Sequence, residues 1–169
     1  MPHIHERYDH TISAFVLHPD QTKILLVFHK KLGKMMQIGG HIELDEDPWE
    51  ALAHEVLEEA GLILGQCQVL LQPDQPRVDN PSHKTLPIPF HYEVHNLLAD
   101  GSHKHIDTGY ALKSYTDQIR PAEGESQEFE WVSRSRLEQL DTDGRVLPGI
   151  YQVARWLFAN QALWSIKQK

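Results

Sequence analysis

Residues 40–62, GHIELDEDPWEALAHEVLEEAGL, carry the clearest structural pattern in the chain. Its middle carries a full set of helix signals: Asp47 is a good N-cap residue, Pro48 stands at the first helical position, and Glu50 follows the cap by three residues. At position 61 stands glycine, the residue type that most often ends a helix. Together these signals predict a helix that begins after Asp47 and ends before Gly61.

The predicted helix has one apolar face and one acidic face. At about 100° per residue, its apolar side chains fall on one side, where they can bury against a sheet: Trp49, Leu52, Ala53, Val56 and Ala60. Glu55, Glu58 and Glu59 fall together on the other side, and this spacing costs roughly a few tenths of a kcal/mol per exposed pair. A divalent cation relieves such repulsion, and hard carboxylate oxygens favour Mg²⁺, with Mn²⁺ as a substitute. Taken alone, the spacing also fits a solvated acidic helix face.

The pattern extends beyond the three glutamates to the whole stretch. Glu46 follows Gly40 after five residues, and seven more residues separate Glu46 from His54. The stretch resembles the Nudix box, G-x5-E-x7-R-E-U-x-E-E-x-G-U, in which U is aliphatic, and it matches the six fixed Gly or Glu positions. With each residue type at about 7% of average usage, six such matches occur by chance on the order of 10⁻⁷ times per starting point.

The resemblance implies a fold, an activity and a set of ligands. The implied fold is α+β, the family's α/β/α sandwich around a mixed sheet, and we expect a single such domain over residues 1–169. The implied activity is Mg²⁺-dependent hydrolysis of a diphosphate linkage, in a nucleoside diphosphate joined to another group, by attack of water on phosphorus. The implied metal ligands are the carbonyl of Gly40 and the carboxylates of Glu55, Glu58 and Glu59. Glu46 and Gly61 would be structural residues of the motif.

One residue departs from the box, because His54 stands where the family has an arginine. That arginine pairs with the glutamate at the position of Glu46 through its guanidinium group, which is always charged. A histidine side chain offers only one or two hydrogen-bond donors, and its ordinary pKa is about 6.5. We therefore expect a weaker and pH-sensitive pair, in which His54 bonds to Glu46 or to its helix neighbours Glu50 and Glu58.

Hydrolysis of a phosphoanhydride also requires a base that takes a proton from water. One candidate is Glu55 in the box. The other lies in the acidic segment 123–128, because many Nudix enzymes have an additional metal ligand or base in this loop. Glu125, six residues before Trp131, is the best match. A solvated acidic loop is the alternative reading of this segment.

Residues 103–107 alternate along a predicted strand, so that His103, His105 and Asp107 share one face. We expect these three side chains to line the substrate cleft. Lys34, together with Lys30 and Lys31 of the same basic loop, is a candidate to reach the substrate phosphates, although lysines in a turn are common at protein surfaces. The H-x-H spacing on a strand also begins a cupin-type site, which keeps a His-ligated metal enzyme as an alternative. A second alternative is a non-catalytic Nudix-fold module that binds nucleotides.

The rest of the chain supplies strands and two further helices. Apolar and β-branched runs predict strands at 11–17, 23–29, 66–71, 88–95, 103–113 and 129–132. Helical periodicity is present at 134–140 and 149–164, and a proline-rich connection spans 73–89, as is typical of a substrate lid or specificity loop. Trp131 and Tyr92 are candidates to stack on a nucleobase, although strand aromatics more often belong to the core.

Composition limits the class of protein. A chain of 169 residues with 40% hydrophobic content fits one domain. A net charge of −8 argues against a protein that binds the nucleic-acid backbone non-specifically. A single cysteine excludes a disulfide framework, the N-terminus lacks the apolar region of a secretory signal, and no apolar run is long enough to span a membrane. We expect a cytoplasmic protein with a nucleotide-type substrate and no stable membrane or nucleic-acid partner. The resemblance is compatible with a homodimer.

Overall fold

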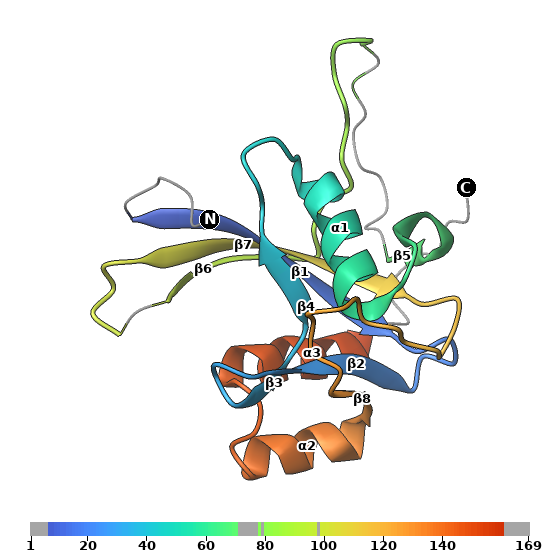
Figure 1. Cartoon of the computed structure of the whole chain (residues 1–169), viewed down its shortest axis with the longest axis vertical. Coiled ribbons are helices and arrows are strands. Elements are labelled where there is room, and N and C mark those ends of the chain that lie inside the picture. Colours follow the sequence, from blue (N-terminus) through green and yellow to red (C-terminus); the bar gives the residue numbers. More distant parts are fainter. Residues whose placement is uncertain (1–6, 71–77, 79, 98, 161–169) are drawn as a thin grey trace.

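The two longest strands, β1 (Tyr8–Leu17) and β7 (Lys104–Lys113), run parallel and in register along their whole length at the centre of the sheet (Figure 1). The figure shows a computed structural model, which describes residues 7–70, 78, 80–97 and 99–160. Parallel strands cannot be joined by a tight turn and need a long crossover. The glutamate helix lies within the crossover between β1 and β7.

The other strands extend this central pair into an eight-stranded sheet with the order β3-β2-β1-β7-β5. Off this path, β4 pairs with β1, β6 pairs with β7 and β8 pairs with β2, all of them antiparallel. The strand bounds are β2 Lys23–His29, β3 Lys34–Met36, β4 Ile38–His41, β5 Gln68–Val69, β6 His91–Asn96 and β8 Phe129–Ser133. The central pair therefore has β4 beside β1 on one side and β6 beside β7 on the other.

Helices cover both faces of the sheet (Figure 1). They are α1 (Pro48–Ala60), α2 (Arg134–Thr142) and α3 (Pro148–Asn160). Alternate residues of β1 point to opposite faces: Ile12 and Val16 pack in the core with α1, whereas Phe15 and Leu17 pack in the core with α2 and α3. This arrangement is the predicted α/β/α sandwich around a mixed sheet. Among the helices of the described residues, none has the length and apolar character needed to cross a membrane.

α1 begins and ends at the residues that the sequence indicates. Asp47 Oδ1 accepts hydrogen bonds from the backbone N–H groups of Trp49 (2.8 Å) and Glu50 (3.0 Å), and the Glu50 carboxylate accepts one from the Asp47 N–H (2.9 Å). This reciprocal pair is a capping box. Gly61 ends the helix with a φ of +67°, and a Cβ there would lie 2.4 Å from the Arg120 carbonyl oxygen. Only glycine fits this position, so Gly61 fixes the end of the glutamate helix.

Two of the predicted strands were wrong at their boundaries. The described residues 66–70 do not form one strand, because a hydrogen bond from the Cys67 N–H to the Leu64 carbonyl (3.0 Å) closes a 3₁₀ turn, η1 (Leu64–Gln66), before the two-residue strand β5. The strand predicted from residue 88 begins only at His91, since Pro89 has no N–H to donate to a neighbouring strand.

Two further predictions extend beyond the described residues. α3 is described as far as Asn160, so the predicted helical residues 161–164 lie outside the described part. Residues 73–77 and 79 of the proline-rich connection also lie outside it. Within the described part of this connection, the Lys84 ammonium pairs with the carboxylates of Asp47 and Glu50. The connection therefore contacts the start of α1.

Candidate active site

Two of the three helix glutamates lie against strand β4. The Gly39 N–H donates a hydrogen bond to Glu59 Oε2 (3.0 Å). A Cβ on Gly40 would lie only 2.0 Å from Glu55 Oε1, so the Glu55 carboxylate rests directly on the glycine backbone. A side chain at position 40 would displace that carboxylate. The two glycines thus allow carboxylates from α1 to lie against the backbone of β4.

Partial burial opposes the ionisation of these two glutamates. Burial raises the pKa of Glu55 to about 7, and the charges of Glu58 and Glu125 add to this effect while His54 opposes it. Burial also raises the pKa of Glu59 to about 7, although a backbone hydrogen bond opposes the shift. Each carboxyl is therefore partly protonated at neutral pH when no cation is bound, and a bound cation would favour the ionised form.

Glu125 belongs to the same site, although it comes from the loop before β8. Its charge acts on both Glu55 and Glu59. Together with Glu59 it lines a pocket of about 250 Å³, to which Lys30 and Lys31 also contribute from the turn after β2. We call this space the glutamate pocket. It combines carboxylates, which bind cations, with ammonium groups, which bind phosphate.

His54 contacts two carboxylates at once. Its Nδ1 lies 3.1 Å from Glu46 Oε1 and its Nε2 lies 3.0 Å from Glu58 Oε1. The hydrogen bond to Glu58, together with the charges of both carboxylates, raises the pKa of His54 against the opposing effect of burial. Glu50, the third predicted partner of His54, pairs with Lys84 instead. Histidine therefore links the loop residue Glu46 to the helix residue Glu58.

We expect His54→Arg to retain hydrolysis within a few-fold of wild type and to make stability less dependent on pH. The folded-state pKa of His54 is raised, so its stabilising charge is fully present below about pH 6.5 and is lost as pH rises through the folded-state pKa, whereas arginine stays charged. Thermal unfolding should therefore give similar melting temperatures near pH 6 and a higher value for the variant near pH 9. A large loss of activity in His54→Arg would show that histidine has another role.

A second pocket adjoins the glutamate pocket on the α3 side of the sheet. It has a volume of about 210 Å³ and lies between the central strands and the start of α3. Met36 and Gln37 line both pockets. The remaining wall is partly apolar, as at Phe15 and Val153, and partly polar, as at Glu93. We call this space the sheet–α3 pocket.

The predicted substrate contacts on β7 separate into two groups. Asp107 lines the sheet–α3 pocket, where it accepts hydrogen bonds from Thr11 Oγ1 (2.8 Å) and Ser13 Oγ (2.9 Å). His103 and His105 lie toward the start of β7, with their ring centroids 5.7 Å apart. They belong to a cluster of imidazoles that adjoins this pocket, because His95 packs against the His105 ring and also lines the pocket with Asp107.

The three candidate lysines of the basic loop lie in two different places. The Lys34 ammonium donates a hydrogen bond to the Gly144 carbonyl, at the edge of the sheet. Lys30 and Lys31 line the glutamate pocket. The loop thus contributes Lys30 and Lys31 to the lining of the pocket, whereas Lys34 lies elsewhere.

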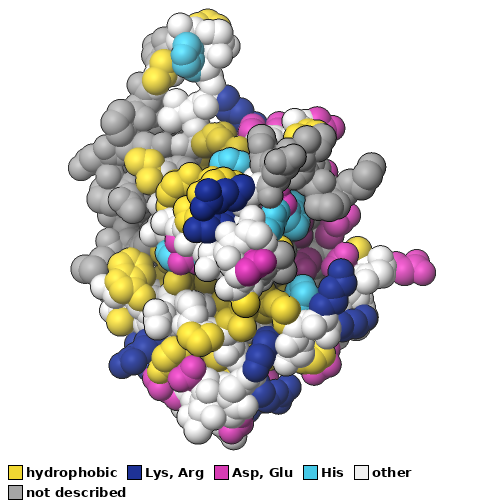
Figure 2. All heavy atoms as spheres, turned by 90° about the vertical axis from the view of Figure 1, so that its left-hand side faces the viewer, with side chains coloured by type: hydrophobic (Ala, Val, Ile, Leu, Met, Phe, Trp, Pro, Cys, Tyr) yellow, Lys and Arg dark blue, Asp and Glu magenta, His cyan; other side chains and the backbone are white. Residues whose placement is uncertain are grey.

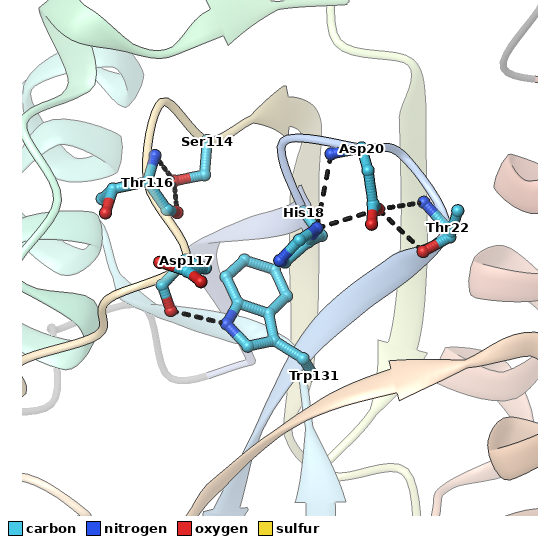
Figure 3. A network of polar contacts seen from close by, with 7 residues as sticks. All are labelled: His18, Asp20, Thr22, Ser114, Thr116, Asp117 and Trp131. Carbon is cyan, nitrogen blue, oxygen red and sulfur yellow. Dashed lines mark hydrogen bonds and ion pairs between the residues drawn. The ribbon is translucent and has the colours of Figure 1, made fainter.

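The two aromatic candidates differ in their surroundings. Trp131 Nε1 donates to the Asp117 carbonyl (2.9 Å), and its ring meets the His18 ring edge to face at 5.0 Å (Figure 3). These contacts hold Trp131 in the wall of the core that contains α1. Tyr92, on β6, is 63% exposed. Trp131 therefore packs as a structural residue, as strand aromatics usually do.

Comparison with known proteins places this geometry in a family. A family model described as the NUDIX domain matches residues 7–157. A hydrolase of the NUDIX family from Clostridium perfringens has a similar structure, with a TM-score of 0.68 at 28% identity over 90% of this chain and 97% of that chain. No curated protein matches the sequence.

Two more distant structures share the fold alone. An Ap4A hydrolase from C. elegans has a TM-score of 0.65 at 15% identity, over 92% of this chain and 99% of that chain. The E. coli dihydroneopterin triphosphate pyrophosphohydrolase has a TM-score of 0.63 at 12% identity, over 91% and 99%. Because the family model spans most of the sequence, from β1 to α3, this protein belongs to the Nudix hydrolase family.

Proposed function

We propose that this protein hydrolyses a diphosphate linkage in a nucleoside diphosphate joined to another group. Mg²⁺ would be held by the Gly40 carbonyl and by Glu55, Glu58 and Glu59. The observation that carries the proposal is the pair of carboxylates, Glu55 and Glu59, held against β4 where burial opposes their ionisation. Donor sets made only of oxygen fit Mg²⁺ or Mn²⁺ and leave positions for water and substrate phosphate.

The side chains of the site have separate roles in this reaction. Lys30 and Lys31 attract the substrate phosphates to the glutamate pocket. Glu125 or Glu55 takes the proton from the attacking water, and His54 holds Glu58 in place. When bound, Mg²⁺ would neutralise charge on the diphosphate and make water more acidic. We place this activity in the cytoplasm and in a single domain over residues 1–169.

The group attached to the diphosphate would occupy the sheet–α3 pocket. Met36 and Gln37 line both pockets, so a substrate whose phosphates lie beside Glu59 can extend past these residues toward α3. The mixed apolar and polar wall suits a ring system that carries hydrogen-bonding groups. The similar structures are named for Ap4A and for dihydroneopterin triphosphate, so the fold itself does not fix the attached group.

Turnover of a nucleotide panel with Mg²⁺ tests the proposal. The panel should contain ordinary and oxidised nucleoside triphosphates, nucleotide sugars, ADP-ribose and dinucleoside polyphosphates, with products followed by chromatography and ³¹P NMR. We expect cleavage of a phosphoanhydride in one of these classes, and its loss when a chelator removes the metal. Tight binding of a nucleotide without any product would instead favour a non-catalytic binding module.

We expect Val153→Trp to weaken the use of substrate by filling the sheet–α3 pocket. Val153 lies on α3 and lines this pocket, whose volume of about 210 Å³ is small enough for an indole ring to obstruct. The apparent KM should rise by roughly tenfold or more, as expected when about 1.4 kcal/mol of binding is lost, with kcat changed much less. Steady-state kinetics on the best substrate measure this. An unchanged KM would place the attached group elsewhere.

Removal of metal should make the protein's stability fall as pH rises from about 5 to 8. The pKa values of Glu55 and Glu59 are raised to about 7 in the folded protein, above the ordinary 4.5. Both carboxyls are protonated in the folded and the unfolded protein below about pH 4.5. As pH rises through 7 they ionise in the folded protein, and this ionisation lowers the free energy of unfolding. Saturating Mg²⁺ should raise the melting temperature at pH 8 by roughly 5 to 10 °C, and by less at pH 5. Differential scanning calorimetry with and without chelator measures both effects.

A further inference from the structure

A cluster of imidazoles around one buried carboxylate lies where β4, β1 and β7 run side by side. The strand register places Asp9 opposite His105, and Thr11 opposite His41. Residues two apart on a strand point to the same face, so Asp9, His41 and His105 converge on the α3 side of the sheet. One ligand atom from each of the three residues lies within 4.8 Å of the others. Figure 2, which views the molecule from the left-hand side of Figure 1, shows histidine side chains next to acidic ones.

Among the described residues, the buried Asp9 carboxylate of this cluster forms ion-pair contacts with histidines but no hydrogen bond of normal geometry. Asp9 is only 1% exposed, and within the described part of the chain neither of its carboxylate oxygens accepts a hydrogen bond. Its Oδ2 lies 3.1 Å from His103 Nε2 and 3.6 Å from His41 Nε2. Nε2 of His105 is also buried without a hydrogen-bond partner among these residues. Buried polar atoms of this kind are costly unless something binds them.

We propose that Asp9, His41 and His105 bind one divalent transition-metal ion of the class that prefers imidazole nitrogen, with Zn²⁺ as its representative. Two imidazoles and one carboxylate are a ligand set of zinc sites, and this set leaves a coordination position open. The donors differ from those of the glutamate pocket, which are oxygen only. The two sites therefore select different metals.

The neighbouring histidines support this site without being needed as ligands. His103 contacts Asp9 Oδ2 and positions the carboxylate. His95 packs edge to face against His105, with ring centroids 5.3 Å apart, while its Nδ1 lies 3.3 Å from Glu93 Oε1. Burial, and then the charges of the surrounding histidines, lower the pKa of His105 to about 4. His105 is thus neutral at pH 7, which is the form that binds a metal.

The site would connect directly to strand β4, against which the helix glutamates lie. His41 is the last residue of β4 and directly follows Gly40, against which the Glu55 carboxylate rests. Bonds from one ion to Asp9, His41 and His105 would join β1, β4 and β7. Such an ion would hold β4 in the position that brings its glycines to the helix glutamates.

Zinc binding to the full, tag-free chain tests the proposal. Metal-free protein is dialysed against Zn²⁺ with Mg²⁺ in large excess, and bound zinc is measured by mass spectrometry. We expect one zinc per chain in the wild type and in the double variant Glu55→Gln/Glu59→Gln. Asp9→Asn and His105→Gln should each weaken binding by at least about 100-fold, beyond what loss of a supporting residue costs. The matched control is His10→Gln, since His10 adjoins Asp9 in sequence but points to the opposite face of β1.

X-ray absorption at the zinc edge of the wild-type complex gives a result that does not depend on how well any variant folds. Scattering from imidazole rings is expected, because two of the three ligands are histidines. Zinc surrounded only by oxygen overturns the proposal, as does wild-type protein that binds no zinc. Zinc that is lost from the double glutamine variant but retained by Asp9→Asn also overturns it, because the ion would then lie at the helix glutamates.

Discussion

Glu59→Gln is expected to lower kcat/KM by roughly 100- to 1000-fold, because a ligand of the catalytic metal would lose its charge and the metal contributes several kcal/mol to catalysis. Glutamine keeps the shape of the side chain, and its amide oxygen can still accept the hydrogen bond that the Gly39 N–H donates to Glu59. The substitution therefore removes charge while leaving the contact between α1 and β4 in place. Steady-state kinetics at several Mg²⁺ concentrations measure the loss.

The same variant should be more stable than wild type when metal is absent and the pH is high. The pKa of Glu59 is raised to about 7 by burial, so the wild-type carboxyl is mostly protonated near pH 5 and mostly ionised near pH 8. Glutamine resembles the protonated form and avoids the cost of the buried charge at pH 8. Melting temperatures should be similar near pH 5 and higher for the variant near pH 8. With Mg²⁺ present near pH 8, the wild type should have the higher melting temperature, because the ion stabilises the wild type more than the variant.

Glu123→Gln is the matched control for this experiment. Glu123 is an exposed residue of the acidic loop before β8, so its replacement changes the net charge by the same amount without touching the buried carboxylates. Activity and stability should stay close to those of wild type. If Glu59→Gln behaved like this control in both measurements, the helix glutamates would be an ordinary solvated face.

The glutamate helix could be predicted because its signals are local. Asp47, Pro48, Glu50 and Gly61 each act within a few residues, and the i, i+3 and i+4 spacing places three glutamates on one face before any tertiary contact is known. The apolar face of the helix follows from the same periodicity. Burial of Glu55 and Glu59 could not be predicted in this way, because it depends on how closely β4 approaches the helix.

Features that depend on strand pairing could not be predicted from the sequence. Asp9, His41 and His105 come together only because β1 pairs with β4 on one side and with β7 on the other. The alternation of His103, His105 and Asp107 was visible, but the partners of each side chain depend on the adjacent strand. The direction of each lysine in the basic loop depends on the turn after β2, which places Lys30 and Lys31 in the glutamate pocket.

Glu125→Gln is expected to lower kcat by roughly 100-fold, within the range that loss of a general base costs. Glu125 comes from a loop separate from the box, yet it lines the glutamate pocket and its charge acts on both Glu55 and Glu59. Glu55 instead rests against the Gly40 backbone, beside the groups that would hold the metal. This placement makes Glu125 the better group to receive a proton from water.

The dependence on Mg²⁺ separates the two roles open to Glu125. If it is the base, the loss in kcat persists at saturating Mg²⁺, because supplying more metal does not replace a proton acceptor. If it is a metal ligand, high Mg²⁺ restores most of the rate, and Glu55→Gln should then show the loss that metal cannot restore. Glu123→Gln, two residues away in the same loop, should leave kcat within about twofold of wild type under both conditions. The comparison assigns the proton transfer to one carboxylate, because only the base variant stays slow when the metal site is full.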